Sequence, residues 1–209
     1  MESTLRAAAG APDLMLIETL GWNGAAFARL DLHLARLARS ATMLDWPCGD
    51  AAAALHAAVP ANAARVRLTL DAFGKFDVTV AQMPAPIPVW RLGLAKARLK
   101  SADPWLTLKS TNRSAYDAAR ANLPVGVDEV IFQNESGQVC DGTITTLFFD
   151  RGNGLRTPPL QCGLLPGVLR AEMNVPEEVL MVEDLPNLRL WVGNSLRGLA
   201  PAIWGTKPQ

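Results

Sequence analysis

One lysine, Lys109, precedes a run of small hydroxyl and amide side chains in the stretch LKSTNRSAYDAAR (residues 108–120). A lone lysine is usually a solvated surface charge, so this stretch alone does not mark a functional residue. Three other segments change that interpretation: Asp141 follows a predicted strand, a loop with glycine and proline at 163–170 leads into a predicted helix, and GNS occupies 193–195 before a turn. Backbone N–H groups and short hydroxyls at such places can converge on an anion. The sequence therefore predicts a small-molecule site that includes an anion-binding part.

The composition indicates a folded protein whose partner is a small molecule. The chain has 209 residues, 49% of them hydrophobic, so it can bury one large core or two smaller ones. Its 20 Lys and Arg balance 20 Asp and Glu, and no segment concentrates one sign. This balance argues against nucleic acid or an anionic membrane as the partner. Cys48, Cys140 and Cys162 form no C-x-x-C pair, so we expect neither a disulfide framework nor a metal site.

The N-terminal residues and the apolar pattern predict a cytoplasmic protein. Glu2 and Asp13 lie where a signal peptide needs a basic region followed by an uninterrupted apolar one. No apolar run approaches the length of about 18 residues that a membrane span needs. Unpaired cysteines also suit a reducing compartment.

In the first half of the chain, strand patterns and helix patterns alternate. Strand-like runs occur at 13–19, 26–30, 64–71, 75–82 and 90–97, the first two around the turn GWNG. Helical spacing of apolar residues occurs at 31–46 and 50–59. The proline-rich segment 83–90 is interpreted as an edge loop in preference to a linker, because a strand follows at once. Together these runs predict a strand meander with helices on one side, an α+β pattern.

The second half is predicted to be rich in strands. Helical patterns cover 113–122 and the residues that follow Pro166, which suits a first helical turn. Strand-like runs occur at 128–134, 145–150, 177–185, 188–198 and 199–205.

Five motifs follow one another in a fixed order. They are H-x-x-R-L from His33, K-S-T-N-R-x-x-Y-x-x-A-R from Lys109, D-E-V-I-F-Q-N-x-x-G-x-V-x-D-G-T from Asp128, T-P-P-L-x-x-G-L-L-P-G-V-L-R from Thr157, and G-N-S-L-R-G from Gly193. Together they resemble the class IV aminotransferases, the fold type IV family that uses pyridoxal 5′-phosphate. The resemblance implies a two-domain α+β fold like that of D-amino acid aminotransferase. A small α/β N-terminal domain at 1–100 and a strand-rich pseudo-barrel C-terminal domain at 101–209 would hold the cofactor between them, in a homodimer.

The resemblance also implies roles for particular residues. Lys109 would carry the cofactor as a Schiff base and move protons at the α carbon of an amino substrate, and partial burial beside a cationic cofactor lowers the pKa of an amine as this requires. Arg36 would hold the cofactor phosphate through its guanidinium fork, and His33 is interpreted as a residue that positions either Arg36 or the helix. Backbone N–H groups at a helix start and a nearby turn would complete the phosphate site, at Val168, Leu169, Asn194 and Ser195.

Asp141 stands where the family usually has a glutamate that pairs with the pyridine nitrogen. A carboxylate there keeps the nitrogen protonated, and the protonated ring accepts the electrons released at the α carbon. Aspartate can do the same with a side chain that is one methylene shorter. Thr143, two residues later, is a weaker candidate for contact with substrate or cofactor.

The substrate carboxylate has no obvious partner in this sequence. The arginine that the family commonly has at the end of the E-T-x-R segment is Gly21 here. Arg65, Arg67 and Arg113 are the alternatives, and the sequence does not choose among them.

Two reactions of the family begin with the same removal of the α proton by Lys109. In 4-amino-4-deoxychorismate lyase, a step of folate biosynthesis, the electrons expel an enolpyruvyl ether and give pyruvate and 4-aminobenzoate. In a transaminase that acts on a branched-chain or other small amino acid, a keto acid must recharge the cofactor. The compact chain and the segment S-A-D-P-W-L-x-x-K-S-T-N-R-x-x-Y are more similar to short lyase-like members of the family than to branched-chain aminotransferases, and this resemblance favours the lyase. A fold relative without catalysis stays open as a third interpretation.

Overall fold

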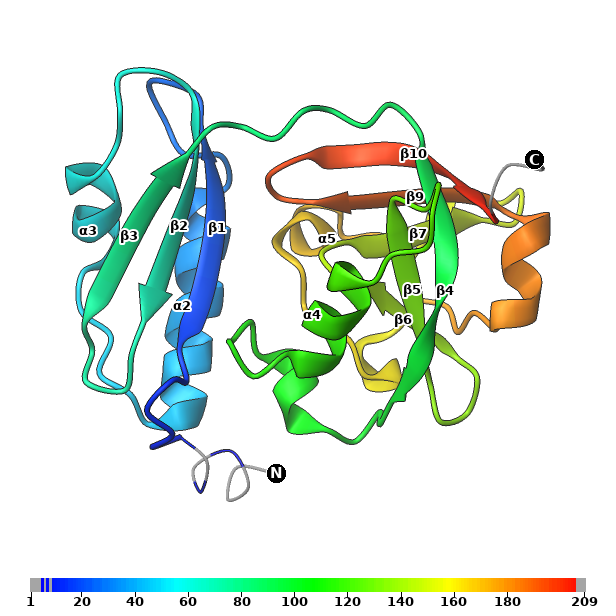
Figure 1. Ribbon diagram of the computed structural model, residues 1–209, viewed down its shortest axis with the longest axis horizontal. Coiled ribbons are helices and arrows are strands. Elements are labelled where there is room, and N and C mark those ends of the chain that lie inside the picture. Colours follow the sequence, from blue (N-terminus) through cyan, green and yellow to red (C-terminus); the bar gives the residue numbers. More distant parts are fainter. Residues whose placement is uncertain (1–4, 6, 8, 206–209) are drawn as a thin grey trace. The chain divides into compact units, whose positions relative to one another are not determined.

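Two units make up the chain in the computed structural model, which describes residues 5, 7 and 9–205 (Figure 1). The first unit comprises residues up to Ala85 together with Leu108–Asn112, and the second comprises Pro86–Thr107 and the residues from Arg113 onward. The boundary expected at residue 100 does not coincide with this division, because the strand that ends at Leu99 pairs only with strands of the second unit. The proline-rich segment expected to be an edge loop contains the first point at which the chain passes between the units, between Ala85 and Pro86.

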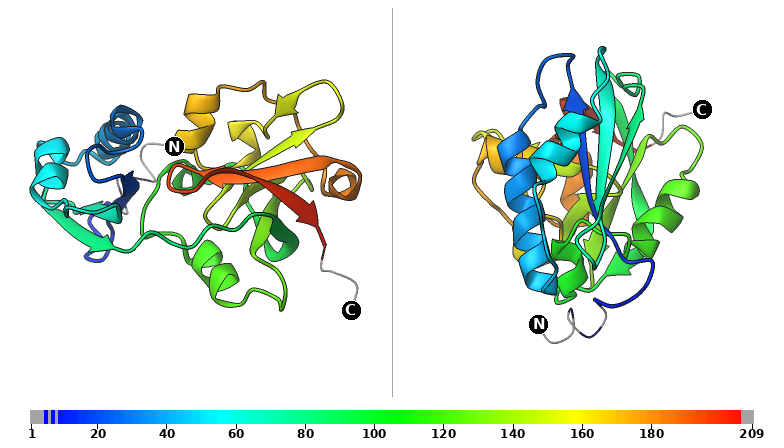
Figure 2. Two further views of the ribbon diagram at one scale, coloured as in Figure 1. Left: turned by 90° about the horizontal axis from the view of Figure 1, so that it is seen from above. Right: turned by 90° about the vertical axis from the view of Figure 1, so that its left-hand side faces the viewer.

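The first unit is an antiparallel sheet with two helices on one face. Its strands, in the order β1-β2-β3, are β1 (Leu16–Trp22), β2 (Ala64–Leu70) and β3 (Phe76–Ala81), and its helices are α2 (Leu30–Leu44) and α3 (Ala51–Ala57). Both helices lie on the same side of the sheet (Figure 2, left). Every second residue of β1, starting from Leu16, is buried on the helix side, as the alternation of side chains along a strand requires. Three of the five strands predicted for this half form this sheet, with the helices on one side as predicted, whereas the strand predicted at 90–97 belongs to the second unit.

The strand expected at 26–30 does not form. After β1, the Asn23 carboxamide oxygen accepts the N–H groups of Ala25 and Ala26, which closes a tight turn. Phe27 makes only an isolated bridge to Trp22, and α2 begins shortly afterwards at Leu30. The apolar alternation of this stretch therefore reflects burial around a turn and a helix start.

The second unit is built on a seven-stranded curled sheet. Its strand order is β6-β5-β4-β10-β9-β7-β8. The strands are β4 (Trp90–Leu99), β5 (Glu129–Asn134), β6 (Val139–Gly142), β7 (Thr146–Asp150), β8 (Leu155–Arg156), β9 (Arg189–Asn194) and β10 (Gly198–Trp204). The curl brings β6 and β7 together although they are far apart in the strand order, and Gly142 N–H donates to the Thr145 carbonyl between them. The predicted strand-rich pseudo-barrel is confirmed.

Two helices and three short 3-10 turns complete the second unit. They are α4 (Ser114–Ala121) and α5 (Val168–Met173), with 3-10 turns at Pro104–Thr107, Leu160–Cys162 and Val182–Asn187. The last of these replaces the end of the strand expected at 177–185, and within that range Glu177 and Met181 make isolated bridges to Thr157 and Gln138. One apolar cluster centres on Trp90, Leu147 and Phe149, and a second on Phe132, Cys140 and Leu164 beneath α4. No helix in the described part of the chain is long and apolar enough to cross a membrane.

Candidate functional site

A buried ion pair links β1 to α2 in the first unit. Glu18 lies on the helix side of β1, and its carboxylate accepts from Arg36 Nε at 2.9 Å and from Arg36 Nη2 at 2.6 Å. The same carboxylate lies 2.6 Å from His33 Nδ1. His33 and Arg36 are one helical turn apart on α2, so a single helix face brings both to Glu18. Two bonds to one guanidinium fix its plane, and His33 therefore acts on Arg36 through Glu18.

The ionisation of Glu18 follows from these contacts. Burial alone raises the pKa of its carboxyl group, but the charge of Arg36 and the hydrogen bonds from His33 and Arg36 outweigh burial, so the pKa lies below its ordinary value. Glu18 is therefore a carboxylate at neutral pH. Sequence analysis did not identify this residue as part of the site, although an acid on the buried face of a strand was a visible signal.

Replacing Glu18 by glutamine should destabilise the first unit by about 3 kcal/mol at pH 7, because it leaves the Arg36 charge buried without its carboxylate. Since the pKa of Glu18 is lowered on folding, its contribution is present above the unfolded pKa and is lost as the pH falls through the folded one. Urea unfolding at pH 7 and at pH 3, followed by tryptophan fluorescence, measures both effects. Asp31→Asn, an exposed acid on the same helix, is the control, with an expected effect below about 1 kcal/mol. Equal losses in the two variants at pH 7 would contradict this account.

Lys109 belongs to the first unit, in a short extended segment beside β1. Its carbonyl accepts from Ile17 N–H at 2.8 Å, and Ser110 bridges to Leu16. Thr111 continues the pairing through its N–H, which donates to the Met15 carbonyl at 2.9 Å. The backbone of Lys109 is therefore anchored to the strand that carries Glu18. The range 101–209 predicted for the second domain includes Lys109, whereas the contacts of 108–112 assign this segment to the first unit.

The register of β1 and β2 specifies where the candidate carboxylate-binding arginines lie. Gly21 is directly opposite Arg65, and Thr19 is directly opposite Arg67. Opposed residues of antiparallel strands point to the same face with Cβ atoms about 5 Å apart. Arg65 and Arg67 therefore share the sheet face opposite to the helices, and Arg65 neighbours the position where Gly21 has no side chain.

Asp141 is the central polar residue of the second unit. It lies on β6 and is 5% exposed. Its Oδ1 accepts from the Tyr116 hydroxyl at 3.0 Å, and its Oδ2 accepts from Leu165 N–H at 3.1 Å. Burial raises the pKa of Asp141 to about 7, although both hydrogen bonds oppose that rise. Both donors are neutral, so this buried carboxylate is suited to a cationic partner.

A second buried carboxylate fixes the loop that follows β6. Glu129 is fully buried on β5 and accepts from Thr143 Oγ1 at 2.6 Å, Ile144 N–H at 3.2 Å and Thr145 Oγ1 at 3.1 Å. Arg120 Nη1 on α4 lies 3.6 Å from it. The Thr143 hydroxyl is thus engaged with Glu129, which makes Thr143 part of the scaffold of this loop. Glu129 was not predicted from the sequence as a site residue, because only the fold shows that it reaches the loop after β6.

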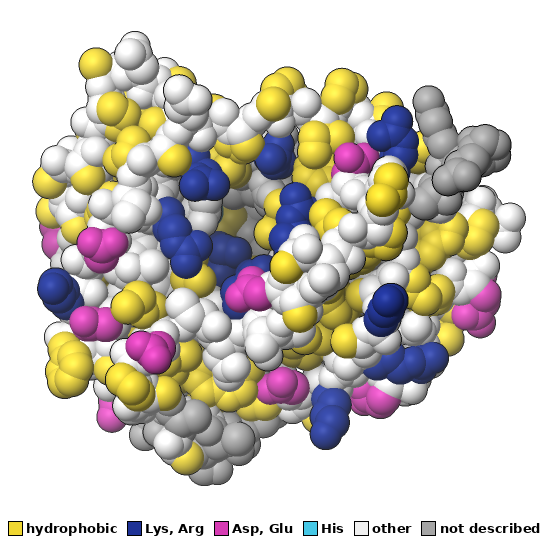
Figure 3. Space-filling model, in the orientation of Figure 1, with side chains coloured by type: hydrophobic (Ala, Val, Ile, Leu, Met, Phe, Trp, Pro, Cys, Tyr) yellow, Lys and Arg dark blue, Asp and Glu magenta, His cyan; other side chains and the backbone are white. Residues whose placement is uncertain are grey.

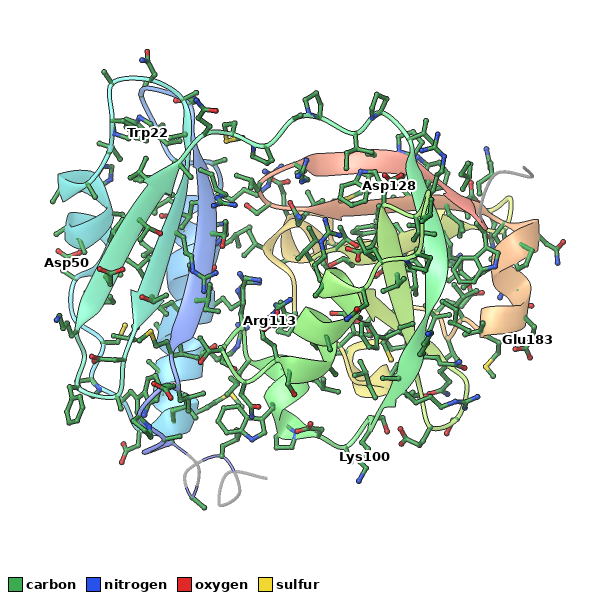
Figure 4. All side chains as sticks on the ribbon, viewed as in Figure 1. Trp22, Asp50, Lys100, Arg113, Asp128 and Glu183 are labelled. Atoms are coloured by element: carbon green, nitrogen blue, oxygen red, sulfur yellow. The ribbon has the colours of Figure 1, made fainter. Side chains whose placement is uncertain are left out.

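Arg113 is likewise held within the second unit, immediately before α4 (Figure 4). Its Nη2 donates to the Thr143 carbonyl at 2.7 Å, and its Nε donates to Asp117 Oδ1 at 2.8 Å. Its guanidinium carbon lies 5.4 Å from the centre of the Tyr116 ring. These contacts bind α4 to the loop after β6 and occupy two of the three guanidinium nitrogens.

The predicted phosphate-binding residues come together where α5 meets β9. A Cβ on Gly193 would lie 2.5 Å from the Gly198 carbonyl oxygen on β10 and 2.6 Å from the Leu169 side chain on α5, so this position has no room for a side chain. The α5 helix begins at Val168 after Gly167, which has no side chain to cap the first turn. The Asn194 carboxamide donates to the Ile144 carbonyl and accepts from the N–H groups of Leu196 and Arg197. Its side chain therefore shapes the turn that carries the buried Ser195.

Each unit thus gathers one group of predicted site residues. Lys109, Arg36 and the β2 arginines belong to the first unit, and Asp141, Thr143, Arg113 and the residues at 168–169 and 194–195 belong to the second. Elsewhere on the second unit, the face seen in Figure 3 has acidic and basic side chains interspersed among hydrophobic ones.

The sequence matches a known family over most of its length. Residues 15–203 match the family model of amino-transferase class IV. The chain belongs to this family. A solved structure of a proposed amino-acid aminotransferase from Mesorhizobium loti is 41% identical, with a TM-score of 0.85, over 92% of this chain and 100% of that one. None of the curated protein sequences compared with this chain matches it.

Two further solved structures share the fold at lower identity. A proposed 4-amino-4-deoxychorismate lyase from Legionella pneumophila is 22% identical, with a TM-score of 0.77, over 91% of this chain and 82% of that one. A proposed branched-chain amino acid aminotransferase from Thermotoga maritima is also 22% identical, with a TM-score of 0.79, over 91% of this chain and 76% of that one. The predicted fold is confirmed, and the two names indicate that one fold serves more than one reaction.

The cofactor of class IV aminotransferases is pyridoxal 5′-phosphate, as predicted. The residues of the second unit fit this group chemically. Asp141 is a buried carboxylate with neutral donors only, which suits a protonated pyridine nitrogen. The first turn of α5 after Gly167 and the turn at Ser195 offer N–H and hydroxyl groups of the kind that bind phosphate.

Proposed function

We propose that this class IV enzyme is a 4-amino-4-deoxychorismate lyase, which releases pyruvate and 4-aminobenzoate. The observation that carries the proposal is Asp141, a buried carboxylate held by two neutral donors with its pKa near 7. Such a group favours a protonated pyridine ring, and every reaction that begins with loss of an α proton depends on that ring. The motif that leads into Lys109 favours the lyase among these reactions.

The chain's own residues supply binding and proton transfer. Bound pyridoxal phosphate supplies a ring that accepts the electrons released at the substrate's α carbon. Lys109 Nζ attaches the cofactor and takes the α proton, while Asp141 holds the proton on the pyridine nitrogen. Arg36, oriented by Glu18, binds the phosphate together with the first turn of α5 and with Ser195. That the residues of both units serve one cofactor is part of this proposal.

The lyase reaction needs no second substrate. Once the α proton has moved to Lys109 Nζ, an electron pair is left at the amine-bearing carbon of the substrate's own six-membered ring. This pair forms a double bond to the neighbouring ring carbon, and the bond from that carbon to the ether oxygen of the enolpyruvyl group breaks. The six-membered ring becomes aromatic 4-aminobenzoate, and the released enolpyruvate takes up a proton to become pyruvate. Arg65 or Arg67 would bind a carboxylate of the substrate from the face of the first sheet opposite to the helices.

A transaminase acting on a branched-chain or other small amino acid is the second candidate. The Mesorhizobium loti relative, at 41% identity, carries the name of an amino-acid aminotransferase, and this favours the alternative. The two reactions share Lys109 and Asp141 and differ in whether a keto acid is consumed. A cytoplasmic homodimer is the expected state of the enzyme in either case and stays a prediction.

The deciding experiment measures pyruvate released from 4-amino-4-deoxychorismate by the purified, cofactor-loaded protein with no keto acid present. Equal amounts of pyruvate and 4-aminobenzoate over many turnovers would establish the lyase. Absence of pyruvate, together with amino-group transfer from a small amino acid to a keto acid, would establish the transaminase. Absence of both reactions in a protein that binds the cofactor would favour a fold relative without catalysis.

A further inference from the structure

Tyr116 is held so that its hydroxyl can reach only a narrow region. It lies on α4, where its ring packs against Phe132 with ring centres 4.8 Å apart and an interplanar angle of 57°. The guanidinium carbon of Arg113 lies 5.4 Å from the same ring centre. Because both neighbours constrain the ring, the hydroxyl has a defined position, 3.0 Å from Asp141 Oδ1.

The two oxygens of Asp141 accept hydrogen bonds from different elements of the second unit. Tyr116 donates to one oxygen from α4, and Leu165 N–H donates to the other from the loop that leads into α5. A carboxylate has about four lone-pair sites, so two donors orient the group and still leave it able to accept from a third. An aspartate has one rotatable bond fewer than a glutamate, so two donors are enough to fix it.

We propose that Tyr116 is a positioning residue, which holds the Asp141 carboxylate in the orientation that accepts the pyridine N–H of the cofactor. This inference rests on the proposed role of Asp141. It explains how the shorter side chain serves in place of the family's glutamate: the donors that fix it come from α4 and from the loop before α5. Tyr116 lies in the sequence motif that begins at Lys109, yet the sequence alone gives it no partner.

The ionisation of the two groups agrees with a donor role for Tyr116. Burial and the neighbouring charge of Asp141 raise the pKa of Tyr116 far above its ordinary value, so the phenol keeps its proton. Burial also raises the pKa of Asp141, and the nearby Glu129 adds to that rise, while the bonds from Leu165 and Tyr116 and the charge of Arg113 oppose it. Loss of the Tyr116 hydroxyl should therefore make Asp141 harder to ionise.

The test is a double-mutant cycle on cofactor binding. Apo-proteins carrying Tyr116→Phe, Asp141→Asn or both changes are titrated with pyridoxal phosphate between pH 6 and pH 9, and tryptophan fluorescence reports binding. Tyr116→Phe keeps the ring on Phe132 and removes only the hydroxyl. We expect it to weaken binding about 10-fold, as for loss of a hydrogen bond to a charged group, and to move the pH midpoint of binding upward. In the Asp141→Asn background the same change should matter less than about 2-fold.

The control and the outcomes separate this inference from the proposed function. Ser101→Ala removes another hydroxyl that donates to a carboxylate, Glu135, and should leave cofactor binding unchanged. If Asp141→Asn weakens binding and Tyr116→Phe does not, the inference is overturned while the role of Asp141 stands. Equal losses from Tyr116→Phe in both backgrounds would show a merely structural role and also overturn it. If the unmodified protein binds no pyridoxal phosphate, the proposed function fails and this inference fails with it.

Discussion

Replacing Lys109 by alanine should lower the rate of product release by at least about 10⁴-fold, because the amine is both the attachment point of the cofactor and the base for the α proton. The fold should survive the change. Lys109 contributes to the first unit through its backbone, whose carbonyl accepts from Ile17 N–H, and alanine keeps that bond. Pyruvate release and the thermal unfolding midpoint, measured on the same preparations, separate the two effects.

A chemical readout makes the Lys109 prediction independent of the substrate. Borohydride treatment of the loaded protein should fix the cofactor's mass on the peptide that contains residue 109, and the alanine variant should show no such addition. Lys100→Ala, which removes an exposed lysine from the second unit, serves as the control and should behave like the unmodified protein. Turnover of the Lys109→Ala protein within 10-fold of the unmodified one, a margin far smaller than base catalysis contributes, would refute the assignment.

Patterns of neighbouring residues predicted most of the helices and strands, because the spacing of apolar residues along a short segment largely determines which of the two it forms. Alternating apolar residues specified β1, β2 and β3, and helical spacing specified α2, whose observed range is Leu30–Leu44. The prediction failed at 26–30, where a side chain–backbone turn at Asn23 and an early helix start compete with the strand pattern. It failed again at the unit boundary, since no local signal announces that residues 108–112 return to pair beside β1.

The site was predictable only as far as its residues lie in motifs. Lys109, Arg36 and Asp141 could be named from sequence, but the groups that orient them could not. Glu18 reaches Arg36 across 18 positions, and Tyr116 reaches Asp141 across 25. Such hydrogen bonds depend on strand register and helix placement, which a single sequence does not specify. An acidic residue at a strand position that the alternation predicts to be buried, as at Glu18, is a sequence signal for such an orienting residue.

The buried carboxyl group of Asp141 should lower the stability of the apo-protein, although the proposed reaction needs it. Its pKa is about 7 in the folded chain, against an ordinary value of 3.8 for this group. Between these values the folded state holds a proton that the unfolded state has lost, so the stability of the apo-protein falls as the pH rises through this window. A difference of roughly three pKa units corresponds to at most about 4 kcal/mol, the full cost being reached above the folded pKa.

Asp141→Asn should therefore make the apo-protein more stable at pH 8, by roughly 2 kcal/mol once the loss of about 1 to 2 kcal/mol for one mismatched donor is subtracted. Near pH 5 the gain should nearly vanish, because the pH then lies only about one unit above the unfolded pKa of 3.8. The cost of the raised pKa is then roughly 1.6 kcal/mol, and the mismatched donor offsets it. Thermal unfolding of both apo-proteins from pH 5 to pH 8 measures the change, with Asp77→Asn on the exposed side of β3 as a control that should stay within about 0.5 kcal/mol at every pH.

The same variant should lose cofactor affinity and turnover, since an amide cannot neutralise a pyridinium nitrogen. A protein that becomes more stable without its cofactor and less active with it would identify Asp141 as a charge kept for the reaction at the expense of the fold. If Asp141→Asn instead destabilises the apo-protein equally at pH 5 and pH 8, the buried carboxylate is a structural acceptor for Tyr116 and Leu165, and the pyridine nitrogen must find another partner.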